Sequence, residues 1–238
     1  MTAQPPSAEQ QYRCQTPLNL YDAPTLSSLA TQAARDRYLR IRYLPGGPVS
    51  SNSAVEVCLC EDDYPGWLAI GDLAALTPAA TPYTPRVLTR PDIVAQIPGA
   101  IAFAQAALTR PNVYLWGGTV GPNFDCSGLV QTAFATVGVW LPRDAYQQEA
   151  FTQPIAIADL APGDLVFFGP PHKATHVGLY LGDSRYIHSS GKDQGHNGIA
   201  IDPLGTEGGA ISQAYYAQLR GAGRIMTSYQ PQAIAAPG

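Results

Sequence analysis

The sequence predicts an α+β protein in which a small β-barrel precedes helices packed on an antiparallel sheet. Several short strand-like runs fall within residues 12–78, which is typical of a small barrel. Helical patterns then occupy residues 92–138, and strand-like runs return after residue 164. Helices followed by a group of strands is the α+β arrangement, so we expect two domains of different character.

Composition limits the size of the core and the kinds of partner. The 238 residues are 45% hydrophobic and 13% charged, which is enough to bury a core in one large or two smaller domains. The net charge is −4 and no long basic run occurs, so nucleic acid is not an expected partner. No apolar run approaches the roughly 20 residues of a membrane helix. The first ten residues lack the basic and apolar regions of a secretory signal, which predicts a cytoplasmic protein.

The predicted barrel domain covers residues 12–78 and follows a polar, Pro-rich lead-in over residues 1–11, which we expect to be disordered. Residues 25–34 could form a short helix or a loop. Prolines among Thr and Ala predict a linker over residues 79–92. The barrel strands are expected at residues 38–44, 54–60 and 67–70, with a turn at Pro45–Pro48, and residues 18–21 precede a turn at residues 22–24.

The second predicted domain covers residues 93–229, and residues 230–238 form a Pro/Ala-rich tail that we expect to be flexible. Its first helix begins at or near Asp92, with Pro98 in the first turn. A second helix follows Asp125 and stops at Gly138. Strands are expected at residues 165–168, 176–181, 186–189 and 199–201.

Cys126 stands apart from the other cysteines, Cys14, Cys58 and Cys60, because of its place in a helix. It follows Asp125, whose side chain is typical of an N-cap, so its backbone falls in the first turn. Unpaired amides and the macrodipole favour negative charge there, so we expect a thiolate with a pKa below the usual value of about 8.5. Cys126 is therefore a candidate nucleophile, and a buried core thiol is the alternative.

A cysteine nucleophile needs a base, and the base needs a group that orients it. All four histidines lie after Cys126. His176 begins one predicted strand and His188 ends the next, so a tight hairpin would place them side by side. His172 and His196 lie in polar loops and are expected to be exposed and non-catalytic. A loop separates His172 from His176, which disfavours a zinc site with Cys126, and we expect no metal or other cofactor.

Six motifs occur in the order typical of the NlpC-type bacterial cell-wall cysteine peptidases, which are papain-like, and the resemblance covers roughly residues 95–225. Residues 12–78 are similar to a bacterial SH3-like barrel with a recognition turn at Tyr64–Trp67. Together the two parts resemble the γ-D-glutamyl-L-diamino acid endopeptidases. The six motifs are Tyr114–Gly118, Asp125–Gly128, Pro142–Asp144, Pro162–Phe168, His176–Tyr180 and Tyr186–Ser189.

The resemblance implies a role for each matching residue. Cys126 would be the nucleophile, His176 its base and His188 the residue that orients the base. The Tyr114 hydroxyl and the Cys126 amide would face the developing oxyanion. Asp144 could instead be only a helix cap. The implied substrate-binding residues are Tyr64, Trp116, Asp125, Ser127 and Asp144, and further acidic candidates for holding an amine are Glu56, Glu61, Asp62 and Asp63.

The implied activity is hydrolysis of the γ-D-glutamyl–L-diamino acid bond in peptidoglycan stem peptides that carry a free N-terminal L-Ala. A tyrosine and a carboxylate would hold that free amine, so peptides still attached to sugar would be rejected. With the expected cytoplasmic location, this implies recycling of muropeptides. Two alternatives remain: an acyltransferase or amidase that uses the same Cys–His pair, and a non-catalytic module that binds wall peptides.

Overall fold

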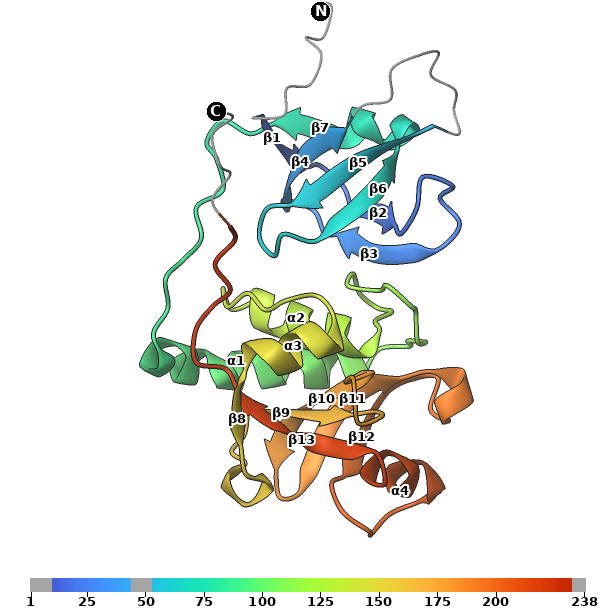
Figure 1. The fold of residues 1–238 in the computed structure, drawn as a ribbon, viewed down its shortest axis with the longest axis vertical. Helices are drawn as coiled ribbons and strands as arrows, with labels where there is room; N and C mark the ends of the chain where they lie inside the picture. Colours follow the sequence, from blue (N-terminus) through green and yellow to red (C-terminus); the bar gives the residue numbers. More distant parts are fainter. Residues whose placement is uncertain (1–9, 44–52, 233–238) are drawn as a thin grey trace, which may run out of the picture. The chain divides into compact units, whose positions relative to one another are not determined.

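A computed structural model describes residues 10–43 and 53–232, and the chain divides into two compact units (Figure 1). The first unit contains the described residues up to Pro85 together with residues 230–232, and the second runs from Arg86 to Tyr229. Residues 1–9 of the predicted lead-in, the predicted turn at Pro45–Pro48 and residues 233–238 of the predicted tail lie outside the described residues. Among the described helices, none is long and apolar enough to cross a membrane.

The first unit is an antiparallel sheet with the strand order β3-β2-β6-β5-β4-β1-β7. Its inner face carries Leu20, Leu39, Val57 and Leu68, all fully buried, because alternate residues of each strand point inward. The elements are β1 (Gln11–Cys14), β2 (Leu18–Tyr21), β3 (Leu29–Ala33), β4 (Tyr38–Tyr43), β5 (Ala54–Leu59), β6 (Pro65–Ala69), the 3-10 helix η1 (Ile70–Ala75) and β7 (Leu76–Pro78).

Two boundaries in this unit differ from the sequence predictions. Residues 29–33, expected to be helix or loop, form β3, which pairs with β2 and buries Thr31 and Ala33 on its inner side. Strand pairing therefore decides the conformation of a segment whose own sequence is ambiguous. Gln11, placed in the disordered lead-in, already belongs to β1, because β4 and β7 flank that strand on both sides.

The second unit packs helices on an antiparallel sheet of order β12-β11-β10-β9-β13-β8, which confirms the predicted α+β class. Its helices are α1 (Arg90–Leu108), α2 (Cys126–Ala135), α3 (Ala145–Phe151) and α4 (Ala210–Tyr216), with the 3-10 turns η2 (Ile157–Asp159) and η3 (Lys192–Gln194). Its strands are β8 (Gln153–Ile155), β9 (Leu165–Phe168), β10 (His176–Gly182), β11 (Arg185–Ser190), β12 (Gly198–Pro203) and β13 (Leu219–Arg224).

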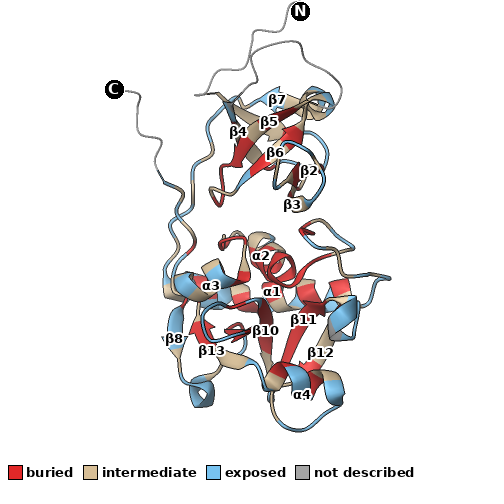
Figure 2. Cartoon of the chain, turned by 45° about the vertical axis from the view of Figure 1, so that its right-hand side comes forward, coloured by how far each residue is buried: buried red, intermediate tan, exposed pale blue. Residues whose placement is uncertain are grey.

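Both faces of this sheet are covered, as Figure 2 shows by the buried residues along its strands. Leu165 and Phe167 of β9 join the core formed with α1 and α2, whereas Val166 and Phe168 pack on the opposite face with Tyr215 of α4. The four residues of β9 are therefore all buried, which explains why this strand reads as a continuous apolar run.

The first helix of this unit begins earlier than predicted. Thr89 is its N-cap and Asp92 its third residue, and the Asp92 carboxylate accepts the Thr89 amide at 2.8 Å. This capping box fixes the start at Arg90, so Pro98 lies inside the helix and not in its first turn. The short helix α4, the edge strand β8 and its neighbour β13 were not predicted.

Candidate active site

Cys126 is the first residue of α2, as predicted. The Asp125 carboxylate caps the helix by accepting the Gly128 amide at 2.6 Å, which confirms the predicted N-cap. A side chain on Gly128 would collide with the carbonyl oxygen of Gly118, so the loop of residues 117–118 packs directly on the helix start. This close packing leaves Cys126 buried, with 6% of its surface exposed.

Asp125 and Ser127, predicted to bind substrate, are both buried and bonded to Arg143. Arg143 Nη2 lies 2.5 Å from Asp125 Oδ2, and its Nη1 donates to Ser127 Oγ at 3.0 Å. The Gly117 amide also donates to Asp125 Oδ2, at 2.9 Å. Because these polar groups already bond to one another inside the protein, the geometry favours a structural role at the helix start over the predicted contact with substrate.

The ionisation of Cys126 differs from the expectation. Burial, and then the neighbouring Asp125 carboxylate, raise the pKa of its thiol to about 12. The backbone amides of Val177 and Ser127 act in the opposite direction but do not compensate. The resting group is therefore a neutral thiol, and the predicted low-pKa thiolate at the helix start is wrong, because desolvation outweighs the helix terminus.

The two histidines predicted to act together do meet, and a carboxylate continues the chain of contacts. His176 Nε2 lies 2.7 Å from His188 Nδ1. On the other side of the same ring, His188 Nε2 lies 3.0 Å from Asp202 Oδ2. The opposite oxygen of Asp202 accepts the Ser212 hydroxyl at 2.9 Å. A continuous hydrogen-bonded chain thus runs from β10 through β11 to β12.

The charge of Asp202 fixes which atom donates in each of these hydrogen bonds. Although burial alone would raise it, hydrogen bonds from His188, His196 and Ser212 hold the pKa of Asp202 well below its usual range. An ionised carboxylate only accepts, so His188 Nε2 carries the proton. Burial lowers the pKa of His188, so its Nδ1 is an unprotonated acceptor for His176 Nε2–H. The remaining nitrogen of neutral His176, Nδ1, therefore holds a free lone pair.

Two tyrosines, Tyr114 and Tyr215, lie near the thiol, and His176 packs on one of them. Burial, and then the nearby His188, lower the pKa of His176 well below its usual value, so its ring is neutral at rest. The ring stacks on Tyr215 with centroids 4.5 Å apart, and the Tyr215 hydroxyl lies 2.8 Å from Ser190 Oγ. Burial first, and then the nearby Cys126 thiol, raise the pKa of Tyr114. The Tyr114 hydroxyl therefore keeps its proton. Trp116 is 69% exposed and open to a ligand.

The other predicted substrate-binding residues have partners of their own. Tyr64 lies between β5 and β6, where it packs on the barrel core of the first unit. Asp144 caps α3 in a capping box with Gln147, as the alternative interpretation expected. The remaining acidic candidates contact arginines: Glu61 and Asp62 bond to Arg37, Asp63 to Arg40, and Glu56 lies 4.0 Å from Arg42.

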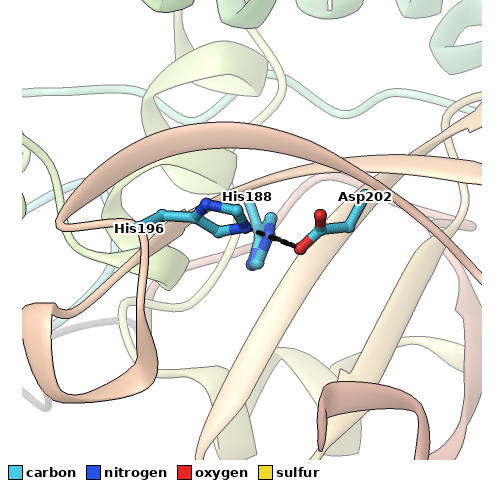
Figure 3. Close-up of side chains that lie close together, drawn as sticks. All are labelled: His188, His196 and Asp202. Atoms are coloured by element: carbon cyan, nitrogen blue, oxygen red, sulfur yellow. Dashed lines mark hydrogen bonds and ion pairs between the residues drawn. The ribbon is translucent and has the colours of Figure 1, made fainter. Parts of the chain in front are cut away.

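Sequence reasoning missed Asp202, Arg143 and Tyr215. A signal existed for Asp202. It lies two residues after Ala200 on the same strand, and Ala200 lies opposite His188 in the β11–β12 pairing. Residues two apart on a strand share a face, so the strand pattern could have placed this carboxylate beside His188. His172 is exposed, as predicted. His196 is also exposed overall, but its Nε2 reaches Asp202 Oδ2 at 2.9 Å (Figure 3).

Two protein families match separate parts of the chain. Residues 111–218 match the NlpC/P60 family, and residues 20–73 match the bacterial dipeptidyl-peptidase SH3 domain. The chain thus contains an NlpC/P60 domain and a bacterial SH3 domain. These matches confirm the predicted SH3-like barrel and papain-like domain.

Named relatives match parts of the chain. The bifunctional muramidase/DL-endopeptidase CwlT of Bacillus subtilis is 46% identical over 81 residues, which is 32% of this chain and 25% of CwlT. The probable endopeptidase p60 of Listeria monocytogenes is 38% identical over 91 residues, covering 38% of this chain and 18% of p60. A solved NlpC/P60 family protein from Bacillus cereus is 23% identical, with a TM-score of 0.49, and the match covers 92% of this chain and 64% of that chain. The chain spans about a quarter or less of the length of these two sequence relatives.

Proposed function

We propose that this chain, which joins a bacterial SH3 domain to an NlpC/P60 domain, is a cysteine peptidase that cleaves peptidoglycan stem peptides. The observation that supports this most strongly is the buried chain His176–His188–Asp202 beside the helix that begins at Cys126. The Val177 amide, next to His176, faces the Cys126 sulfur, which places the start of β10 at the thiol. A thiol, a base and an oriented support for that base are the parts that nucleophilic acyl transfer needs.

The mechanism follows from the direction of the hydrogen bonds. Since the thiol and the imidazole are both neutral at rest, His176 Nδ1 takes the proton from Cys126 as the sulfur attacks the substrate carbonyl. The resulting imidazolium still donates through Nε2 to His188, and the Asp202 carboxylate stabilises its charge through that ring. His176 then gives the proton to the leaving amine, and water hydrolyses the acyl-enzyme with His176 as base.

Two groups are suited to stabilise the tetrahedral intermediate. The Cys126 amide is one of the unpaired N–H groups at a helix start. The Tyr114 hydroxyl stays protonated at neutral pH because burial and Cys126 raise its pKa, so it is a hydrogen-bond donor. We assign both groups to the oxyanion. Trp116, which is largely exposed, is assigned to the wall of the substrate cleft.

We propose the γ-D-glutamyl–L-diamino acid bond as the target, in peptides with a free N-terminal L-Ala. The DL-endopeptidase activity named for CwlT supports a bond of this type. Tyr64 is the residue proposed to contact the amine. Because the candidate carboxylates already contact arginines, the one that binds the amine must share its oxygens with that partner. The cytoplasmic location and the recycling role stay predictions.

The decisive experiment compares L-Ala-γ-D-Glu-diaminopimelate with its N-acylated form and identifies the products by mass spectrometry. We expect free diaminopimelate and L-Ala-D-Glu from the first peptide only. Cys126→Ala should abolish the release. Equal cleavage of both peptides would contradict amine recognition, and transfer of the acyl group to an added amine in place of water would favour an acyltransferase. Peptide binding without turnover by the unmodified protein would favour a wall-peptide binding module.

A further inference from the structure

His188, His196 and Asp202 converge on one point from three parts of the second unit (Figure 3). One nitrogen from each histidine and one carboxylate oxygen all lie within 4.8 Å of one another. Asp202 Oδ2 is 3.0 Å from His188 Nε2 and 2.9 Å from His196 Nε2. Among the described residues, this is the group of His, Cys, Asp and Glu side chains with the spacing to hold a metal ion.

We propose that these three side chains form a binding site for a divalent cation of the zinc type, and that the bound cation switches off the His176 base. Two imidazoles and one carboxylate are ligands that zinc uses in proteins. The site differs from the set Cys126, His172 and His176 that the sequence suggested and that its loop disfavoured. The switch rests on the proposed peptidase function, whereas the binding site does not.

A tetrahedral cation requires the three ligand atoms to shift, because the two imidazole nitrogens, which lie within 4.8 Å of each other, must come closer while both move away from the carboxylate oxygen. With ligands at about 2.0–2.2 Å from zinc, neighbouring ligand atoms lie about 3.4 Å apart. The two observed nitrogen–oxygen distances, 2.9 and 3.0 Å, would therefore widen by about half an ångström or less. The His196 side chain is 26% exposed, which gives the cation a route from solvent and leaves room for water as a fourth ligand.

The three ligands are held from different sides. His188 and Asp202 are diagonal neighbours on β11 and β12, because His188 lies opposite Ala200 in the pairing. Ser212 of α4 holds the second oxygen of Asp202. His196 lies in the connection between the two strands, where Gly195 has a φ of +124° and a side chain there would collide with Ile211. The loop that carries His196 is thus packed closely on α4.

The protonation states favour binding at neutral pH. A metal requires deprotonated ligands. The pKa of Asp202 is held well below its usual range, since hydrogen bonds from His188, His196 and Ser212 outweigh its burial, so the carboxylate is ionised. Burial lowers the pKa of His188, so this ring is neutral. No second proton on His188 has to be displaced, but the one ring proton, which lies on Nε2 in the hydrogen bond to Asp202, must move to Nδ1 before a cation can bind there.

Binding would reverse the hydrogen bond between His188 and His176. A cation binds His188 Nε2 only when that nitrogen has lost its proton, so the ring proton of His188 must lie on Nδ1 in the bound state. Nδ1 then donates to His176 Nε2, which must become the acceptor, and the proton of His176 moves to its own Nδ1. Each ring keeps one proton, so the proton count is unchanged. The lone pair that would take the Cys126 proton is lost.

The binding test uses Zn²⁺ alone, in competition with a chromophoric chelator, on the full chain with Cys126→Ala so that the thiol cannot coordinate. We expect one equivalent to bind, and His196→Gln to weaken the affinity by at least about tenfold, because an amide donor replaces an imidazole ligand. His172→Gln, which changes an exposed histidine outside the cluster, is the matched control and should bind normally. No binding, or equal binding by both variants, would overturn the site.

The switch is tested by the rate at which iodoacetamide alkylates Cys126 in the chain with its natural cysteine. Zn²⁺ should slow this reaction at least about tenfold, EDTA should restore it, and His196→Gln should keep its rate in the presence of Zn²⁺. Peptide hydrolysis should respond in the same way. Equal inhibition of His196→Gln would mean that Zn²⁺ acts on the thiol itself and would refute the switch. Binding in the Cys126→Ala chain together with no peptide hydrolysis at all would reject the peptidase and leave the site standing.

Discussion

Replacing Asp202 with Asn tests whether the carboxylate directs the His188–His176 chain. Asn keeps the size of the side chain but loses the charge and turns one acceptor into an N–H₂ donor. Asp202 Oδ2 now faces two imidazole nitrogens, at 3.0 Å from His188 and 2.9 Å from His196. An amide nitrogen in that place would face N–H groups and would favour the opposite tautomer of His188. His176 Nδ1 would then spend less time as a base.

The structure sets the size of the expected effect. A hydrogen bond to a charged group contributes about 1.5–3 kcal/mol. His188 is fully buried, so solvent does not screen this contact. With a tenfold change in rate for about 1.4 kcal/mol, Asp202→Asn should lower kcat about ten- to 150-fold. KM should change little, because Asp202 is not assigned a contact with the substrate.

The assay is steady-state hydrolysis of L-Ala-γ-D-Glu-diaminopimelate, together with the alkylation rate of Cys126 and a thermal unfolding curve. Ser212→Ala is the matched control: it removes the bond to the other carboxylate oxygen but leaves the charge, so kcat should fall by no more than about threefold. A folded Asp202→Asn protein with normal kcat would refute the reasoning. Equal losses in the two variants would show that Asp202 acts only through packing.

Three further predictions address the thiol, the helix start and the barrel. In His176→Ala, the alkylation rate of Cys126 should rise about tenfold per pH unit between about pH 7 and pH 9, because burial raises the thiol pKa to about 12. A plateau in the alkylation rate within that range would contradict this. Arg143→Met should lower the free energy of unfolding in urea by about 3–5 kcal/mol, since it leaves the buried Asp125 carboxylate without its cation. Adding Asp125→Asn should recover part of this loss, and a change below about 1 kcal/mol in Arg143→Met would argue against a buried pair. Tyr64→Ala should raise KM for the free-amine peptide with little change in kcat, and an unchanged KM in steady-state assays would remove Tyr64 from amine recognition.

The sequence predicts the parts of this site that depend on local structure. Asp125 caps the helix of Cys126 because an Asp before an apolar helical pattern is a strong local signal. The contact of His176 with His188 was also foreseen, since a short hairpin connection leaves few ways to pair the two strands. Both features are fixed by residues close together in the chain.

Features that depend on distant pairing were missed. Asp202 lies 14 residues from His188, and the register of β11 with β12 brings it to the ring. Arg143 meets Asp125 across 18 residues, which no helical or strand period predicts. The same limit applied to β3, whose conformation follows from its pairing with β2. The predicted roles of Asp125 and Ser127 changed for this reason, since the sequence could not show that Arg143 bonds to both.

The thiol of Cys126 shows how a correct local structure led to a wrong chemical expectation. A helix start favours negative charge by about 0.3–1 kcal/mol, which is less than the energy of one pKa unit. Burial opposes it more strongly and raises the pKa to about 12. At rest the thiol is therefore uncharged, and its reactivity depends on a base with a free lone pair. The hydrogen bond from His188 to Asp202 places that lone pair on His176 Nδ1, so in the proposed mechanism the Asp202 carboxylate, two side chains away, prepares the base for Cys126.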